Sequence, residues 1–326
     1  MLVRIFRSTQ FYPIALIVLF SIVIHIVFGL IREPQIGVSG TIFFQDLTNW
    51  VNGLNQWLVA TLVFVLLTSQ ALHLNYTLNK HEIFFKQSWL PALFYLILST
   101  QFAAFLQFSP LLLINSIFIF VLDKIFSLYK NQKTLGVTFD AALLIALVAL
   151  LYAPAIFFVL LFFIGVAILK SINWRDLSIG LIGLLVPLLL MGVGYFINGN
   201  LMEFINQFKN SFTTTYILSN FKLANFLPSA ILISVVFILA LMKIRNNYLK
   251  NVTKSRLCQQ ILLLFVVISI LTIPFTLHIG IQCYMLLIIP FSSIIAYYFL
   301  DGKKIFYQEL LLWIIIANWV YSNFII

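Results

Sequence analysis

Residues 139–171 read FDAALLIALVALLYAPAIFFVLLFFIGVAILKS, an almost wholly apolar stretch with Pro154 near its middle. As a single helix the stretch would be about 50 Å long, whereas the hydrocarbon core of a bilayer is about 30 Å thick. Pro154 lacks a backbone donor and disfavours helix at the residue before it. We therefore predict a pair of short helices folded back at Pro154. Because unpaired backbone groups in lipid are costly, neighbouring helices must cover the turn, so the pair belongs inside a larger bundle.

The composition indicates a membrane protein. Of the 326 residues, 63% are hydrophobic and 9% are charged, whereas soluble domains are about half apolar and about a quarter charged. We predict an all-α, polytopic transmembrane bundle in which residues 1–326 form a single integral membrane domain.

Successive apolar segments predict about eleven membrane spans. They are residues 11–31, 54–74, 89–108, 110–124, the two halves of 139–171, 177–197, 226–242, 257–277, 279–300 and 307–324. Two polar segments, 32–53 and 198–225, contain aromatic residues at helical spacing. We expect these two segments to lie partly in the membrane interface.

The basic residues are distributed unevenly between the two faces that this layout defines. With the N-terminus inside, all 19 Lys and Arg except Arg32, Lys209 and Lys222 fall on inner segments. The positive-inside rule therefore favours a bacterial inner membrane, with a cytoplasmic N-terminus and a periplasmic C-terminus. The net charge of +10 is then a property of the membrane surface. Without a basic folded module, it does not predict nucleic acid as a partner.

Polar residues on the outer side are the candidates for chemistry. The acids there include Glu33 and Asp46, and the cations are Arg32, Lys209 and Lys222. A carboxylate could act as a general base toward an acceptor hydroxyl, while Lys or Arg neutralises a lipid phosphate. The alternative is that all of them are solvated loop charges, with the cations touching the headgroups of membrane lipids.

The remaining polar residues are expected to have structural roles. Asp123 could pair with the adjacent Lys124, and Asp140 and Asp176 come just before apolar helices, where a negative charge suits the helix dipole. Three buried amides are expected to bond between helices: Gln101, Asn115 and Asn318.

The histidines do not predict a metal site. Metal ligands converge within about 2 Å of one ion, whereas the four histidines are scattered over spans and linkers: His25, His73, His81 and His278. Nucleophile elbows, phosphate-binding loops and dinucleotide fingerprints are absent from the sequence. We expect neither a metal nor a cofactor.

Three stretches of the chain resemble a known family. They are NKHEIFFKQSWLPALFY at 79–95, FSPLLLIN at 108–115 with Asp123, and residues 142–168 followed by Trp174, Arg175, Asp176, Gly183 and Pro187. They resemble an uncharacterised family of polytopic inner-membrane proteins of Bacteroidota-type bacteria. Some members of that family carry a carotene-monooxygenase description, so the resemblance implies a membrane-embedded carotenoid oxygenase as a remote alternative.

More distantly, the order of elements is similar to the GT-C class of membrane glycosyltransferases. The shared order is a span, an outer loop with an acid, a Ser-Pro turn, and a short apolar pair broken by proline. The resemblance implies transfer of a sugar from a polyprenyl-phosphate carrier at the outer leaflet. It implies Asp46 as the base, or else Glu33, and it implies that Lys209, Lys222 and Tyr216 hold the carrier phosphate.

Two hypotheses therefore stand side by side. The first is a GT-C-like glycosyltransferase that uses a polyprenyl-phosphate sugar. The second is a non-catalytic envelope protein that scaffolds a membrane protein partner or binds lipid, and it is favoured by the sparse outer acids and the abundant aromatic residues. Transport ranks third, because intramembrane charges are so scarce.

Overall fold

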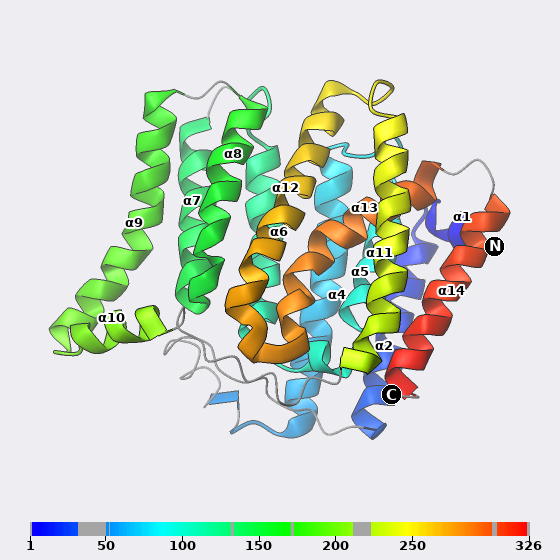
Figure 1. Cartoon of the computed structure of the whole chain (residues 1–326), viewed down its shortest axis with the longest axis horizontal. Helices are drawn as coiled ribbons and strands as arrows, with labels where there is room; N and C mark the ends of the chain where they lie inside the picture. The colour runs from blue at the N-terminus through cyan, green and yellow to red at the C-terminus, as the bar shows by residue number, and fades with distance from the viewer. Residues whose placement is uncertain are drawn as a thin grey trace.

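The computed structural model describes residues 2–31, 50–51, 53–131, 134–170, 173–210, 223–301 and 305–324. Every regular element in these ranges is helical (Figure 1). In chain order the α-helices are α1 (Leu2–Phe6), α2 (Tyr12–Ile31), α4 (Gln56–Lys80), α5 (Leu90–Ser99), α6 (Pro110–Phe126), α7 (Thr134–Leu151), α8 (Val159–Leu169), α9 (Trp174–Ile197), α10 (Leu201–Asn210), α11 (Leu223–Asn246), α12 (Thr253–Thr276), α13 (Ile288–Asp301) and α14 (Ile305–Phe324). The 3-10 helices are η1 (Ala103–Leu106), η2 (Ala153–Phe158) and η4 (Leu277–Leu287).

Seven helices of the described chain are long and apolar enough to cross a membrane. They are Gln56–Lys80, Thr134–Leu151, Trp174–Ile197, Phe226–Asn246, Thr253–Phe275, Ile281–Asp301 and Ile305–Asn323. The prediction of an all-helical bundle with membrane-length helices is confirmed. The count of about eleven spans stays a prediction, because the other apolar helices are shorter.

The chain folds back at Pro154, as predicted. Tyr152 has an extended backbone (φ −150°, ψ 103°), η2 follows, and α8 returns beside α7 (Figure 1). Neighbouring helices cover this turn. The fully buried ring of Phe158 has its centroid 4.2 Å from that of Phe118 in α6 and 4.9 Å from that of Phe265 in α12. This aromatic packing shields the 3-10 turn, which is what a turn at membrane depth requires.

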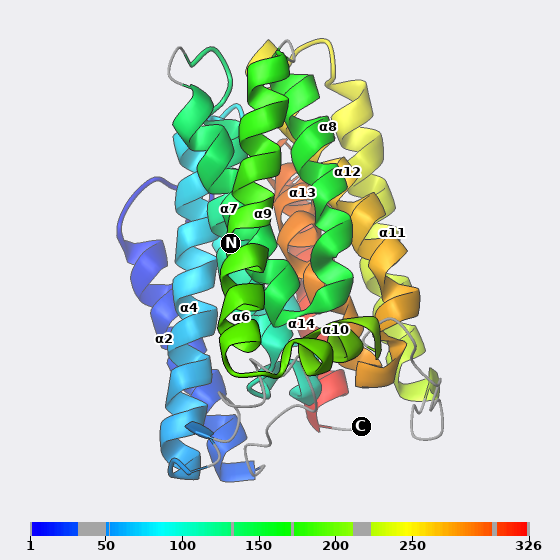
Figure 2. The same ribbon diagram turned by 90° about the vertical axis from the view of Figure 1, so that its left-hand side faces the viewer.

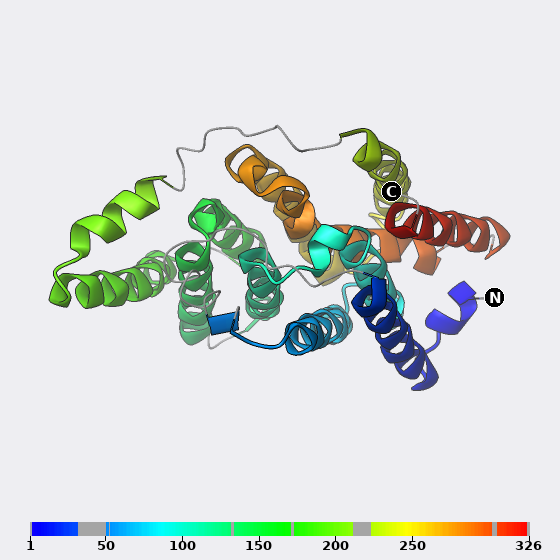
Figure 3. The same cartoon turned by 90° about the horizontal axis from the view of Figure 1, so that it is seen from below.

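The centre of the bundle is formed by α5 and α13, and its edge by α9. All ten residues of α5 are buried, and an 18-residue window within Ile281–Asp301 is 83% buried, against 17% for the corresponding window in α9. Figure 3 shows α5 and α13 enclosed by other helices, with α9 and α10 at one extremity. The first half of α9 packs on α7 through Gly183, where an added Cβ would lie 2.8 Å from the carbonyl oxygen of Phe139.

The predicted span 89–108 is wrong in extent. Its helix α5 ends at Ser99, and only a short 3-10 helix follows. The reason is a set of side-chain bonds from other helices. The carbonyl of Thr100 accepts from Trp319 Nε1 and from Asn323 Nδ2, each at 3.0 Å, and the carbonyl of Ala104 accepts from Gln282 Nε2 at 3.0 Å. These donors satisfy carbonyls that a longer helix would otherwise have used.

The helices run roughly along one axis, which gives the bundle two ends (Figures 1 and 2). The basic end contains α1, the last turns of α4, α6, α8 and α11, and the first turns of α9 and α12. Of the Lys and Arg in the described ranges, all but Lys209 lie there. Lys209 lies in α10 at the far end, where α7, α9, α12 and α14 finish. This separation agrees with the charge asymmetry found in the sequence, and the assignment of the basic end to the cytoplasm stays a prediction.

Candidate functional site

A cavity of about 260 Å³ lies between α11, α12 and α13, toward the far end of the bundle. Residues of α5 and of the chain around η1 close its inner side, and η4 contributes a further wall. Both α11 and α12 pack on α13, while they make little contact with each other. A short turn joins them at the basic end, and they diverge from it toward the far end (Figure 1). The cavity occupies the resulting gap.

Aromatic rings form much of the cavity wall. The Phe226 ring of α11 lies 4.7 Å from Tyr284 of η4, nearly parallel to it, and 5.2 Å from Phe102. Phe105 packs edge-on against Phe102 at 5.5 Å, and Phe291 of α13 also lines the space. The ring contacts hold three separate chain segments, α11, η4 and the chain at η1, at fixed spacing, so the cavity is a built feature of the fold.

The polar side chains on the cavity wall carry no charge. They are Gln101, Ser234 and Tyr284, and the remaining lining residues are apolar. Gln101 also belongs to a buried polar cluster with α11 and α14. Its Nε2 donates to Ser322 Oγ at 2.7 Å, and Ser229 Oγ donates to Asn318 Oδ1 at 3.2 Å. The expected role of Gln101 and Asn318 as interhelical bonding groups is confirmed, as is that of Asn115, which donates to the carbonyl of Met285 at 3.1 Å.

Of the residues predicted for catalysis and phosphate binding, only Lys209 lies within the described residues. Asp46, Glu33, Arg32, Lys222 and Tyr216 lie outside the described residues. Lys209 is exposed on α10, which packs against α9 at the far end. Neither α9 nor α10 lines the cavity, so the structure does not bring Lys209 to its wall.

The acids with described side chains gather at the basic end. The expected local pair of Asp123 with Lys124 is wrong. Asp123 instead binds Lys80 at 2.9 Å and His81 at 2.8 Å, and Lys124 binds Asp140 at 2.6 Å. Each of these pairs joins two helices, because adjacent side chains on α6 point to different neighbours.

Asp140 does not begin a helix, contrary to expectation, because α7 starts six residues earlier, at Thr134. Asp176 does lie in the first turn of α9, as expected, and its Oδ1 also accepts from Lys170 Nζ at 2.7 Å. The Lys170–Asp176 pair is almost buried, with side chains 14% and 5% exposed.

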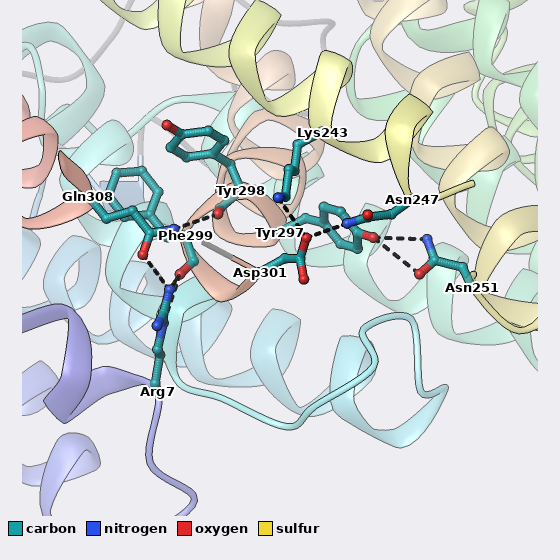
Figure 4. Close-up of polar contacts among 9 residues, drawn as sticks. All are labelled: Arg7, Lys243, Asn247, Asn251, Tyr297, Tyr298, Phe299, Asp301 and Gln308. Atoms are coloured by element: carbon teal, nitrogen blue, oxygen red, sulfur yellow. Dashed lines mark hydrogen bonds and ion pairs between the residues drawn. The ribbon is translucent and has the colours of Figure 1, made fainter. Parts of the chain in front are cut away.

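A polar cluster at the basic end fastens the N-terminal helix to the bundle (Figure 4). The Arg7 guanidinium donates to the carbonyl of Phe299, through Nε at 2.8 Å, and to Gln308 Oε1. Nearby, Asp301 accepts from Asn247 and pairs with Lys243 at 3.0 Å. These contacts link the residue that follows α1 to α13 and α14, link α13 to the end of α11, and give Asp301 structural partners.

Three histidines, His25, His73 and His81, each contact an aromatic ring. Ring centroids of His25 and Phe64 are 5.0 Å apart, and those of His73 and Phe120 are 4.3 Å apart. Within the described chain, no three His, Cys, Asp or Glu side chains come together in a way that could hold a metal ion.

The comparison with protein families covers nearly the whole chain. Residues 19–325 match a family described as a family of unknown function, DUF6427. The chain belongs to this family. No curated protein and no solved structure matches the chain. Membership of DUF6427 agrees with the expected family of unknown function, and the more distant resemblance to GT-C enzymes stays a prediction.

Sequence reasoning missed the cavity, although it had singled out one of its residues. Gln101 was identified as a buried interhelical amide, which is correct, but nothing indicated that it also borders an open space. The aromatic residues Phe226 and Tyr284 belong to two different predicted spans, 226–242 and 279–300. Their proximity follows from the way α11 and η4 meet, which single-segment patterns do not reveal.

Proposed function

We propose that this protein binds part of a lipid chain in the cavity between α11, α12 and α13. The observation that carries the proposal is an uncharged, aromatic-lined cavity that lies between helices of membrane length. Such helices are surrounded by lipid, so the gap between α11 and α12 faces a medium of hydrocarbon chains. In this proposal the chain is a lipid-binding envelope protein of the DUF6427 family.

The size and polarity of the cavity limit what it holds. Pockets for drug-sized ligands are about 300–1,000 Å³, so about 260 Å³ suits a segment of chain and not a whole lipid. No charged side chain lines the wall. A charged headgroup would lose its hydration there without a partner, so it stays outside the cavity.

The positive-inside rule places the basic end in the cytoplasm of a bacterial cell and the cavity in the outer half of the inner membrane. In this orientation the N-terminus is cytoplasmic and the C-terminus periplasmic. Lys222 immediately precedes α11, and with Lys209, Arg32 and Tyr216 we assign it to contacts with lipid phosphates outside the cavity.

The test is to fill the cavity from α11. In Ala230→Trp the indole occupies the space, whereas in the control Ile231→Trp it faces outward, because Ile231 is 61% exposed. Excluding only two methylene groups, each contributing about 0.8 kcal/mol, lowers affinity about tenfold. We expect native mass spectrometry to show about tenfold less retained lipid for Ala230→Trp, with the control unchanged. Equal retention in all three proteins would refute the proposal.

A second candidate is GT-C-like transfer of a sugar from a polyprenyl-phosphate carrier. It is favoured by α10, an amphipathic helix that carries Lys209 at the same end as the cavity. In this candidate the cavity holds the first isoprene units, and Asp46, or else Glu33, acts as the base toward the acceptor hydroxyl.

A membrane protein partner, if the protein is a scaffold, would pack on the exposed half of α9, where Gly192 and Gly194 leave open space.

The glycosyltransferase candidate depends on one carboxylate. In Asp46→Asn we expect loss of the product glycan in cells at a normal protein level, because an amide cannot accept the proton. Glu82→Gln at the basic end is the control and should leave the glycan unchanged. An unaltered glycan profile in Asp46→Asn removes the catalytic role and leaves lipid binding intact.

A further inference from the structure

The connection between α11 and α12 at the basic end of the bundle is rich in positive charge. Its cations lie within residues 245–256, where no Asp or Glu occurs: Arg245, Lys250, Lys254 and Arg256. We call this set the basic turn. Other lysines at the same end each pair with an aspartate: Lys80, Lys124, Lys170 and Lys243. Within the described ranges no carboxylate pairs with a cation of the basic turn, so its charge is available to an external anion.

Hydrogen bonds hold this turn in one conformation. The Asn251 amide exchanges two bonds with the Tyr297 hydroxyl of α13, at 3.0 and 3.1 Å. Asn247 donates to Asp301 at the end of the same helix (Figure 4). Within the turn, the backbone N–H groups of Lys250 and Asn251 donate to the carbonyl of Asn247 at 2.9 and 3.1 Å. The cations are therefore presented on an ordered frame, which lowers the entropy lost when an anion binds.

The guanidinium of Arg256 is positioned by its neighbours. It lies over the Tyr248 ring, 5.3 Å from the ring centroid, and it donates to Thr253 Oγ1 at 3.3 Å. The Tyr248 hydroxyl in turn accepts from Gln260 Nε2 at 3.2 Å. A guanidinium has five N–H donors, so this one bond leaves donors for a phosphate, an anion that arginine binds well.

Two apolar side chains lie beside these cations and are largely exposed. Leu249 is 88% exposed and Val252 is 73% exposed. The turn joins two helices of membrane length, so it lies where the hydrocarbon core meets the lipid headgroups. Cations together with apolar side chains are typical of a surface that binds anionic membrane lipids.

We propose that the basic turn binds the headgroup of an anionic phospholipid. Lys250, Lys254 and Arg256 contact the phosphate, and Leu249 and Val252 contact the adjoining part of the lipid chains. This site lies at the opposite end of the bundle from the cavity, so it does not depend on the lipid-chain binding proposed there. A membrane lipid fits better than an acidic soluble protein, because the two helices place the turn at headgroup depth.

The test compares phosphatidylglycerol with phosphatidylcholine that carries the same acyl chains. Both are added in equal amounts to the full-length protein in a neutral detergent, and retained lipid is measured by native mass spectrometry. Because the chains are identical, binding in the cavity contributes equally to both lipids. We expect the wild type to retain phosphatidylglycerol preferentially, and the preference to fall at high salt, since exposed charges are screened.

Two double variants locate the effect. Lys250→Gln with Lys254→Gln should lower the affinity for phosphatidylglycerol about tenfold or more, because each cation near an anionic headgroup contributes a factor of about five. Lys130→Gln with Arg175→Gln is the control. It removes the same charge from the basic end, after α6 and in the first turn of α9, and should leave the preference unchanged.

Three results would overturn the proposal. Equal retention of the two lipids by the wild type would show that the turn has no preference for an anionic headgroup. Equal losses in the two double variants would show that diffuse surface charge, and not this turn, attracts the lipid. If a poly-glutamate peptide bound the wild type but not the Lys250→Gln, Lys254→Gln variant, while the lipids showed no preference, the turn would serve an acidic protein. None of these results bears on lipid binding in the cavity.

Discussion

Asp176→Ala is expected to destabilise the protein by about 3 kcal/mol or more, because it leaves the Lys170 ammonium buried without its partner. The two side chains are 14% and 5% exposed and lie 2.7 Å apart, between the end of α8 and the first turn of α9. Loss of the carboxylate also removes a favourable charge from the N-terminus of α9. The measurement is the unfolding midpoint in detergent micelles.

A matched pair provides the control. Lys124 and Asp140 lie 2.6 Å apart at the same end of the bundle, but their side chains are 38% and 48% exposed. Such pairs contribute about 0–1 kcal/mol, so Asp140→Ala should change the midpoint little. The double variant Lys170→Met with Asp176→Leu should recover most of the loss, because a well-packed apolar pair can replace a buried ion pair. Equal losses in the two single variants would contradict this account of burial.

Gly183→Leu is expected to detach the first half of α9 from α7. A Cβ at Gly183 would lie 2.8 Å from the backbone oxygen of Phe139 and 3.0 Å from the Cβ of Ala142. Neither atom is the end of a flexible side chain, so the helices must separate. Overpacking of this kind costs about 1–3 kcal/mol and occasionally more. A lower unfolding midpoint, together with increased proteolysis of the chain between α8 and α9, reports this separation.

Gly192→Leu is the control for this substitution in the same helix. No atom lies within 4 Å of a Cβ built at Gly192, so the new side chain enters open space and also favours helix. We expect an unchanged or slightly higher midpoint. If Gly192→Leu proved as harmful as Gly183→Leu, the close approach of α9 to α7 at Gly183 would be wrong.

The helical architecture was predictable because it depends on local signals. Pro154 within an apolar block too long for one span predicts the fold-back, and the structure has it. The uneven distribution of Lys and Arg predicts two unlike ends, and the described residues separate in that way. The length of an apolar segment and the position of a proline within it are local features of the chain, so one sequence is enough to predict where helices span and turn.

Features that depend on tertiary contacts were not predictable. Helix α5 is short because side chains of α14 and η4 bind the carbonyls beyond it, and those donors come some 180 to 220 residues later in the chain. Asp123 pairs with Lys80 and His81 because α4 passes beside α6, and sequence adjacency to Lys124 is no guide to that geometry. The cavity is lined by residues from several apolar segments. Their apolar sequence looks like that of every other span, so it does not show which segments border an open space.

The central claim is that lipid chains occupy the cavity between α11, α12 and α13. Its most direct test is to illuminate the wild-type protein in nanodiscs that contain a lipid with a diazirine on its chain, and to map the labelled residues by mass spectrometry. The account predicts labels concentrated on cavity residues such as Phe226 and Tyr284, above the level on Leu190, which is 69% exposed on α9. Labels spread evenly over the exposed apolar faces, with none enriched in the cavity, would contradict it.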